Sequence, residues 1–206
     1  MLKWVLIILG VALLGAAMVP VSVTWIERRQ SSDLETREPY AKGVSDARVA
    51  VVYFSRSGNT GLAARHLAKR FDAALFELKA PDYQLGLGGW AQAMKDARSN
   101  EADITPRTID LSGYDTVYLG SPIWLYSPAP PIWAFVESNR FDGKHVILFN
   151  TFNSEFKPEF IAAFRDKVMQ QGAHSFEHES VPRGRMTRQS TPEEMLRTID
   201  TEWFLQ

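Results

Sequence analysis

The chain has 206 residues, enough for one domain of ordinary size and an additional segment. Its 23 basic and 24 acidic residues leave a formal net charge of −1, which gives no indication of nucleic-acid binding. It contains no cysteine, so disulfides, thiolate metal sites, iron–sulfur clusters and cysteine nucleophiles are excluded, and any redox chemistry must come from a bound cofactor.

The first element along the chain is an uncharged apolar segment from Trp4 to Ile26. As a helix it would span about 34 Å, enough to cross a hydrocarbon core about 30 Å thick. Tryptophans stand near both ends, where amphipathic rings favour the membrane interface. We therefore expect residues 1–26 to be a transmembrane anchor. A cleaved signal peptide is the alternative, because Lys3 precedes the segment, but the apolar run is longer than a signal core usually is.

Positive charges flank this segment unequally. Lys3 and the α-amino group precede it, and four basic residues follow it closely: Arg28, Arg29, Arg37 and Lys42. Positively charged flanks tend to remain in the cytoplasm. The pattern predicts a single-pass membrane protein whose C-terminal part is cytoplasmic.

Residues 27–47 are polar, lack hydrophobic periodicity and include Pro39 and Gly43. This composition predicts a polar linker between the anchor and the rest of the chain.

From residue 48 onward, short apolar runs alternate with segments of helical periodicity. We expect strands at 48–54, 74–78, 115–121, 145–150 and 173–181. Helices are expected at 60–71, 90–98, 131–137 and 158–170, with a last one opening at Thr191. The alternation predicts one domain, 48–206, with a doubly wound α/β fold around a five-stranded parallel sheet. Ligands of such sheets lie beyond the carboxyl ends of the strands, where the strand order reverses.

The stretch "SRSGNT" (Ser55–Thr60) joins the first expected strand to the first expected helix. Such a turn leaves the first N–H groups of the helix unpaired, with the positive end of the helix dipole behind them. Hydroxyl and amide groups add donors, and Gly58 permits close approach. The patterns G-x-x-x-x-G-K-[ST] and G-x-G-x-x-G do not occur here. The loop predicts a site for a terminal monophosphate; an ordinary capped helix start is the alternative.

Two further loops follow strands of the expected sheet. "GSPIWLYSPAPPIW" (120–133) follows the third, and its prolines could hold Trp124 as a platform for a flat ring. The alternative is that Trp124 merely covers the end of the sheet. "NTFNSEF" (150–156) follows the fourth strand and either borders the same cleft or is an ordinary polar loop. A phosphate cradle beside an aromatic platform suits FMN, which has a flat ring at one end and a monophosphate at the other.

The chain also resembles the flavodoxin-like proteins, specifically the branch with "YDxxxLGxPIW" after the third strand. The matching residues are "VVYFSRSGNT" and "YDTVYLGSPIWLYSPAPPIWAFVE", and the resemblance covers 48–206. It implies the strand order 2-1-3-4-5. It also implies that FMN binds with its phosphate at Ser55, Arg56, Ser57, Gly58, Asn59 and Thr60. The isoalloxazine would lie against Pro122, Ile123, Trp124, Leu125 and Tyr126, bordered by Thr151, Phe152 and Asn153.

These observations predict a membrane-anchored, FMN-binding redox protein in which the flavin performs the chemistry, so no catalytic side chain is assigned. It would either reduce quinone-type acceptors with NAD(P)H or carry electrons to a redox protein partner. From residue 48 onward the chain has 18 basic and 19 acidic residues, so the acidic docking field typical of electron-carrying flavodoxins is missing. The alternative outside redox proteins is a flavin-free interaction module at the membrane.

Other candidate residues are given no functional role. His174 and His178 are four apart on an expected strand, but no third metal ligand is near them in the sequence, and no metal is predicted. Arg183 follows the fifth expected strand with two further arginines. We interpret this segment as a solvated loop, the alternative being that it attracts an anionic partner such as a nicotinamide dinucleotide phosphate.

Overall fold

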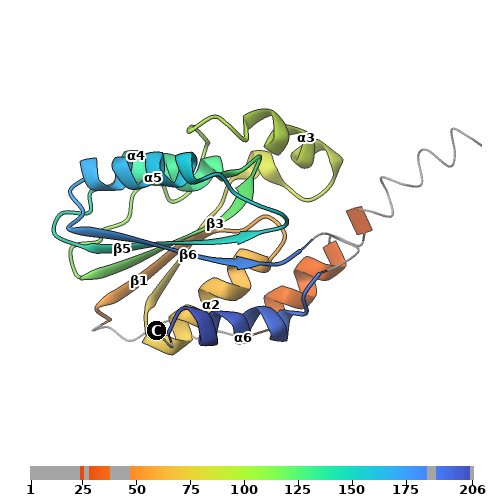
Figure 1. Cartoon of the computed structure of the whole chain (residues 1–206). Helices are drawn as coiled ribbons and strands as arrows, with labels where there is room; N and C mark the ends of the chain where they lie inside the picture. Colours follow the sequence, from red (N-terminus) through yellow and green to blue (C-terminus); the bar gives the residue numbers. More distant parts are fainter. Residues whose placement is uncertain (1–23, 26–27, 38–46, 185–188, 205–206) are drawn as a thin grey trace, which may run out of the picture.

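A computed structural model describes residues 24–25, 28–37, 47–184 and 189–204 (Figure 1). Apart from Thr24 and Trp25, the predicted transmembrane segment lies outside this part of the chain. Within the described residues, no helix is both long enough and apolar enough to cross a membrane.

Five parallel strands form the centre of the molecule, in the order β2-β1-β3-β5-β6. They are β1 (Val49–Phe54), β2 (Ala74–Leu78), β3 (Thr116–Trp124), β5 (His145–Phe152) and β6 (Ser175–Pro182). This is the predicted doubly wound sheet with its predicted order. A short strand that was not predicted, β4 (Ser127–Pro128), pairs antiparallel with the end of β3.

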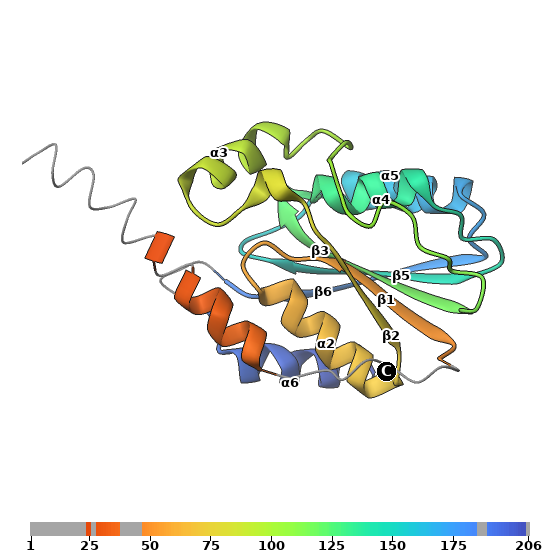
Figure 2. The same cartoon turned by 180° about the vertical axis from the view of Figure 1, so that it is seen from behind.

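Helices cover both faces of the sheet, as right-handed crossovers require (Figures 1 and 2). One face carries α2 (Asn59–Phe71) and α6 (Pro192–Glu202), and the other carries α3 (Leu87–Asp96), α4 (Pro130–Ser138) and α5 (Pro158–Gln170). A turn of 3₁₀ helix, η1 (Pro81–Tyr83), precedes α3. Each face has its own hydrophobic core, and β1 contributes to both, as its unbroken apolar run predicts.

Residues 28–36, expected to belong to an irregular linker, are helical and lie beside α2 and α6 (Figure 1). Leu34 is 1% exposed and belongs to the same core as Leu62 and Met195. The side chain of Arg65 on α2 donates to the carbonyl oxygens of Leu34 (2.5 Å) and Arg37 (3.2 Å). The segment is thus fixed by one apolar side chain and by backbone groups.

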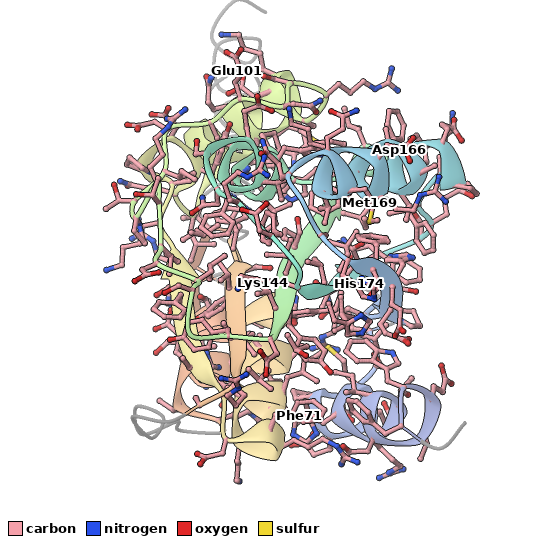
Figure 3. All side chains as sticks on the ribbon, turned by 90° about the vertical axis from the view of Figure 1, so that its left-hand side faces the viewer. Phe71, Glu101, Lys144, Asp166, Met169 and His174 are labelled. Carbon is pink, nitrogen blue, oxygen red and sulfur yellow. The ribbon has the colours of Figure 1, made fainter. Side chains whose placement is uncertain are left out.

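The end of the sheet at which β5 and β6 begin is closed by tight turns (Figure 3). The buried Lys144 donates from Nζ to the carbonyl oxygen of Tyr114 (2.8 Å), and His174 lies just ahead of β6. The loops that follow β1, β3 and β5 lie at the opposite end, where the candidate site is found.

Candidate functional site

The three loops predicted to carry the chemistry converge on one cavity of about 600 Å³. Of the fourteen candidate residues, thirteen line it: Ser55, Arg56, Ser57, Asn59, Thr60, Pro122, Ile123, Trp124, Leu125, Tyr126, Thr151, Phe152 and Asn153. The exception is Gly58, whose role is in the backbone of the loop. Parallel strands bring these residues together, because their carboxyl ends share one edge of the sheet.

The start of α2 is open toward ligands. Gly58 occupies the N-cap with φ 89° and ψ −20°, no side chain caps the helix, and its first turn contains no acidic residue. The carbonyl of Gly58 accepts from the N–H of Leu62 (2.8 Å), and the N–H of Gly58 donates to Ser55 Oγ (3.1 Å). The next N–H groups have no partner within the helix, because the first turn of any α-helix leaves them unpaired. This geometry favours an anion.

Gly58 is required for two reasons. Its positive φ lies in the left-handed region, which residues with a Cβ rarely adopt. A Cβ built at this position would also lie 3.0 Å from Cβ of Leu34. The helical segment 28–36 therefore packs directly behind the loop that offers its N–H groups to the cavity.

Arg56, expected among the phosphate contacts, is engaged with a neighbouring loop. Its Nη2 donates to the carbonyl oxygens of Gly86 (3.0 Å) and Gln84 (3.3 Å). Those residues lie between η1 and α3, so Arg56 fixes the path of the chain along one side of the cavity.

Arg183, which was not among the predicted site residues, also lines the cavity. It is 4% exposed, so its interpretation as part of a solvated loop is wrong. Its Nε donates to Oδ1 of Asn59 (2.9 Å), the first residue of α2. Within the described residues, its buried Nη1 has no hydrogen-bond partner. Burial lowers the pKa of Arg183, because the interior solvates the guanidinium cation poorly.

The hydroxyls of Thr60 and Thr151 lie 2.8 Å apart and link α2 to the end of β5. Both side chains are buried at the edge of the cavity. β5 ends at Phe152, whose ring packs edge-to-face on Phe156 in the loop that follows (5.4 Å between centroids). The third predicted loop therefore borders the cavity, as expected from its place in the sheet.

Trp124 lies in the core more than in the cavity. It is 9% exposed, and its ring makes edge-to-face contacts with Tyr83 (5.1 Å) and Phe54 (5.5 Å). Leu125 and Tyr126 form the two-residue turn between β3 and β4, both with positive φ (42° and 77°). This turn directs Leu125 outward at the cavity.

Among the described residues that line the cavity, the most exposed aromatic side chain is that of Trp90, which was not predicted to be a site residue. Trp90 lies on α3, is 50% exposed and lines the cavity together with Leu87 and Met94. The signal in the sequence was the glycine-rich stretch ahead of Trp90, which positions the start of α3 beside the loop held by Arg56.

His178 is half-buried on β6, and its Nε2 lies 3.0 Å from Oδ1 of Asn150. Burial lowers the pKa of His178 to about 4, so the ring is neutral at neutral pH. His174 precedes β6 and is exposed at the opposite end of the sheet (Figure 3). Among the described residues, no cluster of three or more metal-ligating side chains is found.

The cavity thus combines two kinds of surface. Donors from Ser57, Asn59, Thr60 and the helix start suit an anion, whereas Leu87, Trp90 and Leu125 offer apolar area to a flat ring. A doubly wound α/β sheet with such a cavity at its switch point belongs to the class that binds nucleotide-like ligands.

The particular family follows from residues 48–170, which match the family model described as flavodoxin. The chain belongs to the flavodoxin family. No curated protein sequence matches it.

Two solved flavoprotein structures share the fold, and a third is reported beside them. A provisionally assigned flavoprotein from Bacteroides uniformis ATCC 8492 is 23% identical, with a TM-score of 0.56 over 78% of this chain and 99% of that one. Another from Bacteroides eggerthii DSM 20697 is 19% identical, with a TM-score of 0.53 over 75% and 96%. A flavoprotein from Lactobacillus acidophilus NCFM, solved in complex with FMN, is 21% identical, with a TM-score of 0.49 over 68% and 94%.

Proposed function

We propose that this flavodoxin is an FMN-binding redox protein, held at a membrane by its N-terminal segment, that reduces quinone-type acceptors with NAD(P)H. The observation that best supports FMN as the cofactor is that the uncapped start of α2 and the exposed ring of Trp90 line the same cavity. FMN supplies hydride and electron transfer when bound, and the protein supplies binding and orientation.

The residues present fit the phosphate of FMN. The unpaired N–H groups of α2 and the side chains of Ser57 and Asn59 are hydrogen-bond donors, which a phosphate dianion requires. Glu155 is the one carboxylate among the described residues that line the cavity. The volume of about 600 Å³ lies within the range of small-molecule and cofactor sites.

The residues also fit a flat ring. Trp90 and Leu125 are exposed at the cavity, and Tyr126 lies in the same turn as Leu125. The aromatic face of Trp90 gives the isoalloxazine a stacking surface that excludes water from one side of the ring.

Two features favour the reductase over an electron carrier. The domain lacks a net acidic charge to steer it toward a protein partner, with 18 basic and 19 acidic residues from position 48 onward. Anchoring through residues 1–26 would keep the domain, on the cytoplasmic side, close to the bilayer in which quinones dissolve.

The cofactor is tested with the full-length chain, purified in detergent, by its visible absorbance and by FMN titration. We expect flavin absorbance, and we expect Ser57→Leu to weaken FMN binding at least about tenfold, because leucine removes a donor and fills the cradle. Ser99→Leu, in an exposed turn, is the matched control and should leave binding unchanged. A chain that neither carries nor takes up FMN would instead be a flavin-free interaction module.

The reaction is tested by NAD(P)H oxidation with a water-soluble quinone. Turnover supports the reductase, whereas a flavin that accepts electrons only from a reduced protein identifies a carrier.

The anchor is tested by membrane fractionation of cells, and a mature N-terminus near Met18 would show that the segment is a cleaved signal peptide.

A further inference from the structure

We propose that Arg183 is the residue that neutralises the phosphate in this cavity, so that the site selects a phosphate monoester dianion over the same ligand without its phosphate. The inference rests on the proposed FMN binding and extends it: the preference for FMN over riboflavin comes from this arginine, which lies outside the loop that follows β1.

The first argument is the burial of an unbalanced charge. Arg183 is 4% exposed, and within the described residues it forms no ion pair. Its one side-chain hydrogen bond to a described residue goes to a neutral amide oxygen, Asn59 Oδ1. Removing a guanidinium from water without a counter-ion costs several kcal/mol, so a buried arginine in this state implies an anion that joins it.

The two carboxylates that affect the pKa of Arg183, Glu193 and Glu194, interact with other groups. Among the described residues, Glu193, Arg37 and Glu194 are the charges that influence the pKa of Arg183 besides its burial. Glu193 is exposed and pairs with Arg37, and Glu194 is exposed and closes the start of α6. Neither is a direct partner of the buried guanidinium, and Arg37 adds a further positive charge to its surroundings.

The second argument is the position of the guanidinium. Its bond to Asn59 holds it at the first residue of α2, where the helix dipole is also positive. Two positive groups held together inside the protein repel each other, and an anion beside both of them would offset this repulsion. Asn59 accepts from Arg183 through Oδ1, which leaves its Nδ2 as a donor near Ser57 Oγ (3.4 Å).

The third argument is that the backbone of Arg183 is fixed. Its N–H donates to the carbonyl of Phe152 (2.8 Å), and its own carbonyl accepts from the N–H of Ser190 (3.0 Å). Figure 1 shows the end of β6 passing beside the start of α2. The arginine is therefore held in place before any ligand arrives, which lowers the entropic cost of binding.

A purely structural role is the competing explanation. If Arg183 serves only to orient Asn59, a neutral donor would do the same without the cost of burying a charge. Arg183→Gln keeps an amide donor and removes the charge, so it separates the two explanations. Arg183→Lys keeps the charge and loses the planar set of donors that matches a phosphate.

The experiment compares the full-length wild type with Arg183→Gln and Arg183→Lys, using FMN and riboflavin as probes and flavin fluorescence as readout. We expect Arg183→Gln to weaken FMN binding at least about tenfold while riboflavin binding stays within about twofold. Arg183→Lys should retain part of the preference. Arg140→Gln is the matched control, because Arg140 is exposed and pairs with Asp142. Equal losses for both flavins, or unchanged FMN binding, would overturn the proposal.

A second readout requires no flavin. Inorganic phosphate should raise the Tm of the flavin-free wild type more than sodium chloride of the same ionic strength does, and should not raise that of Arg183→Gln. If the wild type binds neither flavin, FMN binding is refuted, and this phosphate response alone decides the role of Arg183. If Arg183→Gln does not fold, the response of the wild type and of Arg183→Lys decides: a Tm insensitive to phosphate overturns the proposal.

Discussion

The helices α2 and α6 lie on the same face of the sheet, yet their N-termini are built in different ways (Figure 2). At α6, Thr191 Oγ1 accepts from the N–H of Glu194 (3.1 Å), and Glu194 Oε2 accepts from the N–H of Thr191 (2.7 Å). Glu193 adds a second carboxylate to that first turn. At α2, the cap is Gly58, there is no capping side chain, and the first turn has no acid.

The two helix starts differ in whether their N–H groups are already satisfied within the protein. The capping box of α6 satisfies its own N–H groups, and its two carboxylates balance the helix dipole. At α2 the N–H groups stay open, and a buried arginine adds positive charge where α6 has negative charge. The capping box of α6 stabilises that helix, whereas the uncapped start of α2 beside Arg183 leaves donors and positive charge that suit an anion. Four experiments test this contrast, beginning with the largest expected effect.

Gly58→Val tests whether the open start of α2 depends on glycine. Valine at positive φ, with its Cβ 3.0 Å from that of Leu34, should lower the free energy of unfolding by about 3 kcal/mol and abolish FMN binding. Urea denaturation measures the first effect and FMN titration the second. Gly88→Val is the control: a Cβ there meets nothing within 4 Å, and stability should change by less than about 0.5 kcal/mol. Equal stabilities of the two variants would contradict the prediction.

Asn59→Asp gives α2 the acidic first turn that α6 has. The carboxylate would pair with Arg183, whose Nε already lies 2.9 Å from Oδ1, and would oppose the phosphate. We expect the flavin-free protein to gain up to about 1 kcal/mol of stability, while FMN binding weakens at least about tenfold. Calorimetry and FMN titration measure the two effects. Asn100→Asp adds the same charge at an exposed position and should change neither; undiminished FMN binding by Asn59→Asp would refute the contrast.

Thr191→Ala opens the start of α6. Loss of the cap should lower the free energy of unfolding by about 1 kcal/mol and leave FMN affinity unchanged, because this helix start is structural. Chemical denaturation beside FMN titration measures both. Thr201→Ala, on the exposed side of the same helix, should alter stability by less than about 0.5 kcal/mol. A loss of FMN affinity in Thr191→Ala alone would show that the two helix starts are not independent.

The smallest effect is the titration of Glu194. The hydrogen bonds from Thr191 lower the pKa of this carboxyl below its ordinary 4.5. Because the folded pKa is the lower one, the contribution of Glu194 to stability is present above pH 4.5 and is lost as the pH falls through the folded value. NMR titration should place its midpoint below 4.5, and Thr191→Ala should raise it. A midpoint at or above 4.5 in the wild type would be inconsistent with the capping box.

The sheet was predictable because its signal is local. The run "VAVVYF" of β1 has no polar alternation, as burial on both faces requires, and the other strands are separated by segments of helical periodicity. The convergence of the three loops then follows from parallel topology together with the strand order, which the family resemblance implied. Thirteen of the candidate residues therefore meet at one cavity, although their distances in the sequence are large.

The burial of Arg183, the packing of Trp124 and the helix at 28–36 could not be predicted, because they depend on tertiary contacts that leave no local pattern in the sequence. Arg183 is buried and bonds to Asn59 on α2 and to Phe152 at the end of β5, and nothing in its own segment distinguishes it from a solvated arginine. Trp124 was expected in a loop beside the cavity, but its ring packs on Phe54 and Tyr83 in the core, and these contacts join residues far apart in the sequence. The helix at 28–36 has one apolar anchor, too little for a periodicity.

The contact between Leu34 and Gly58 sets a limit on how the protein can be shortened. The family match begins at residue 48, but a fragment cut there would lack the side chain that packs behind the loop after β1. A fragment that keeps this contact includes the helical segment 28–36. Thermodynamic reciprocity adds a second consequence: if docking of this segment strengthens ligand binding, the ligand strengthens docking by the same factor. In that case, displacement of the segment from α2 would weaken ligand binding by that factor.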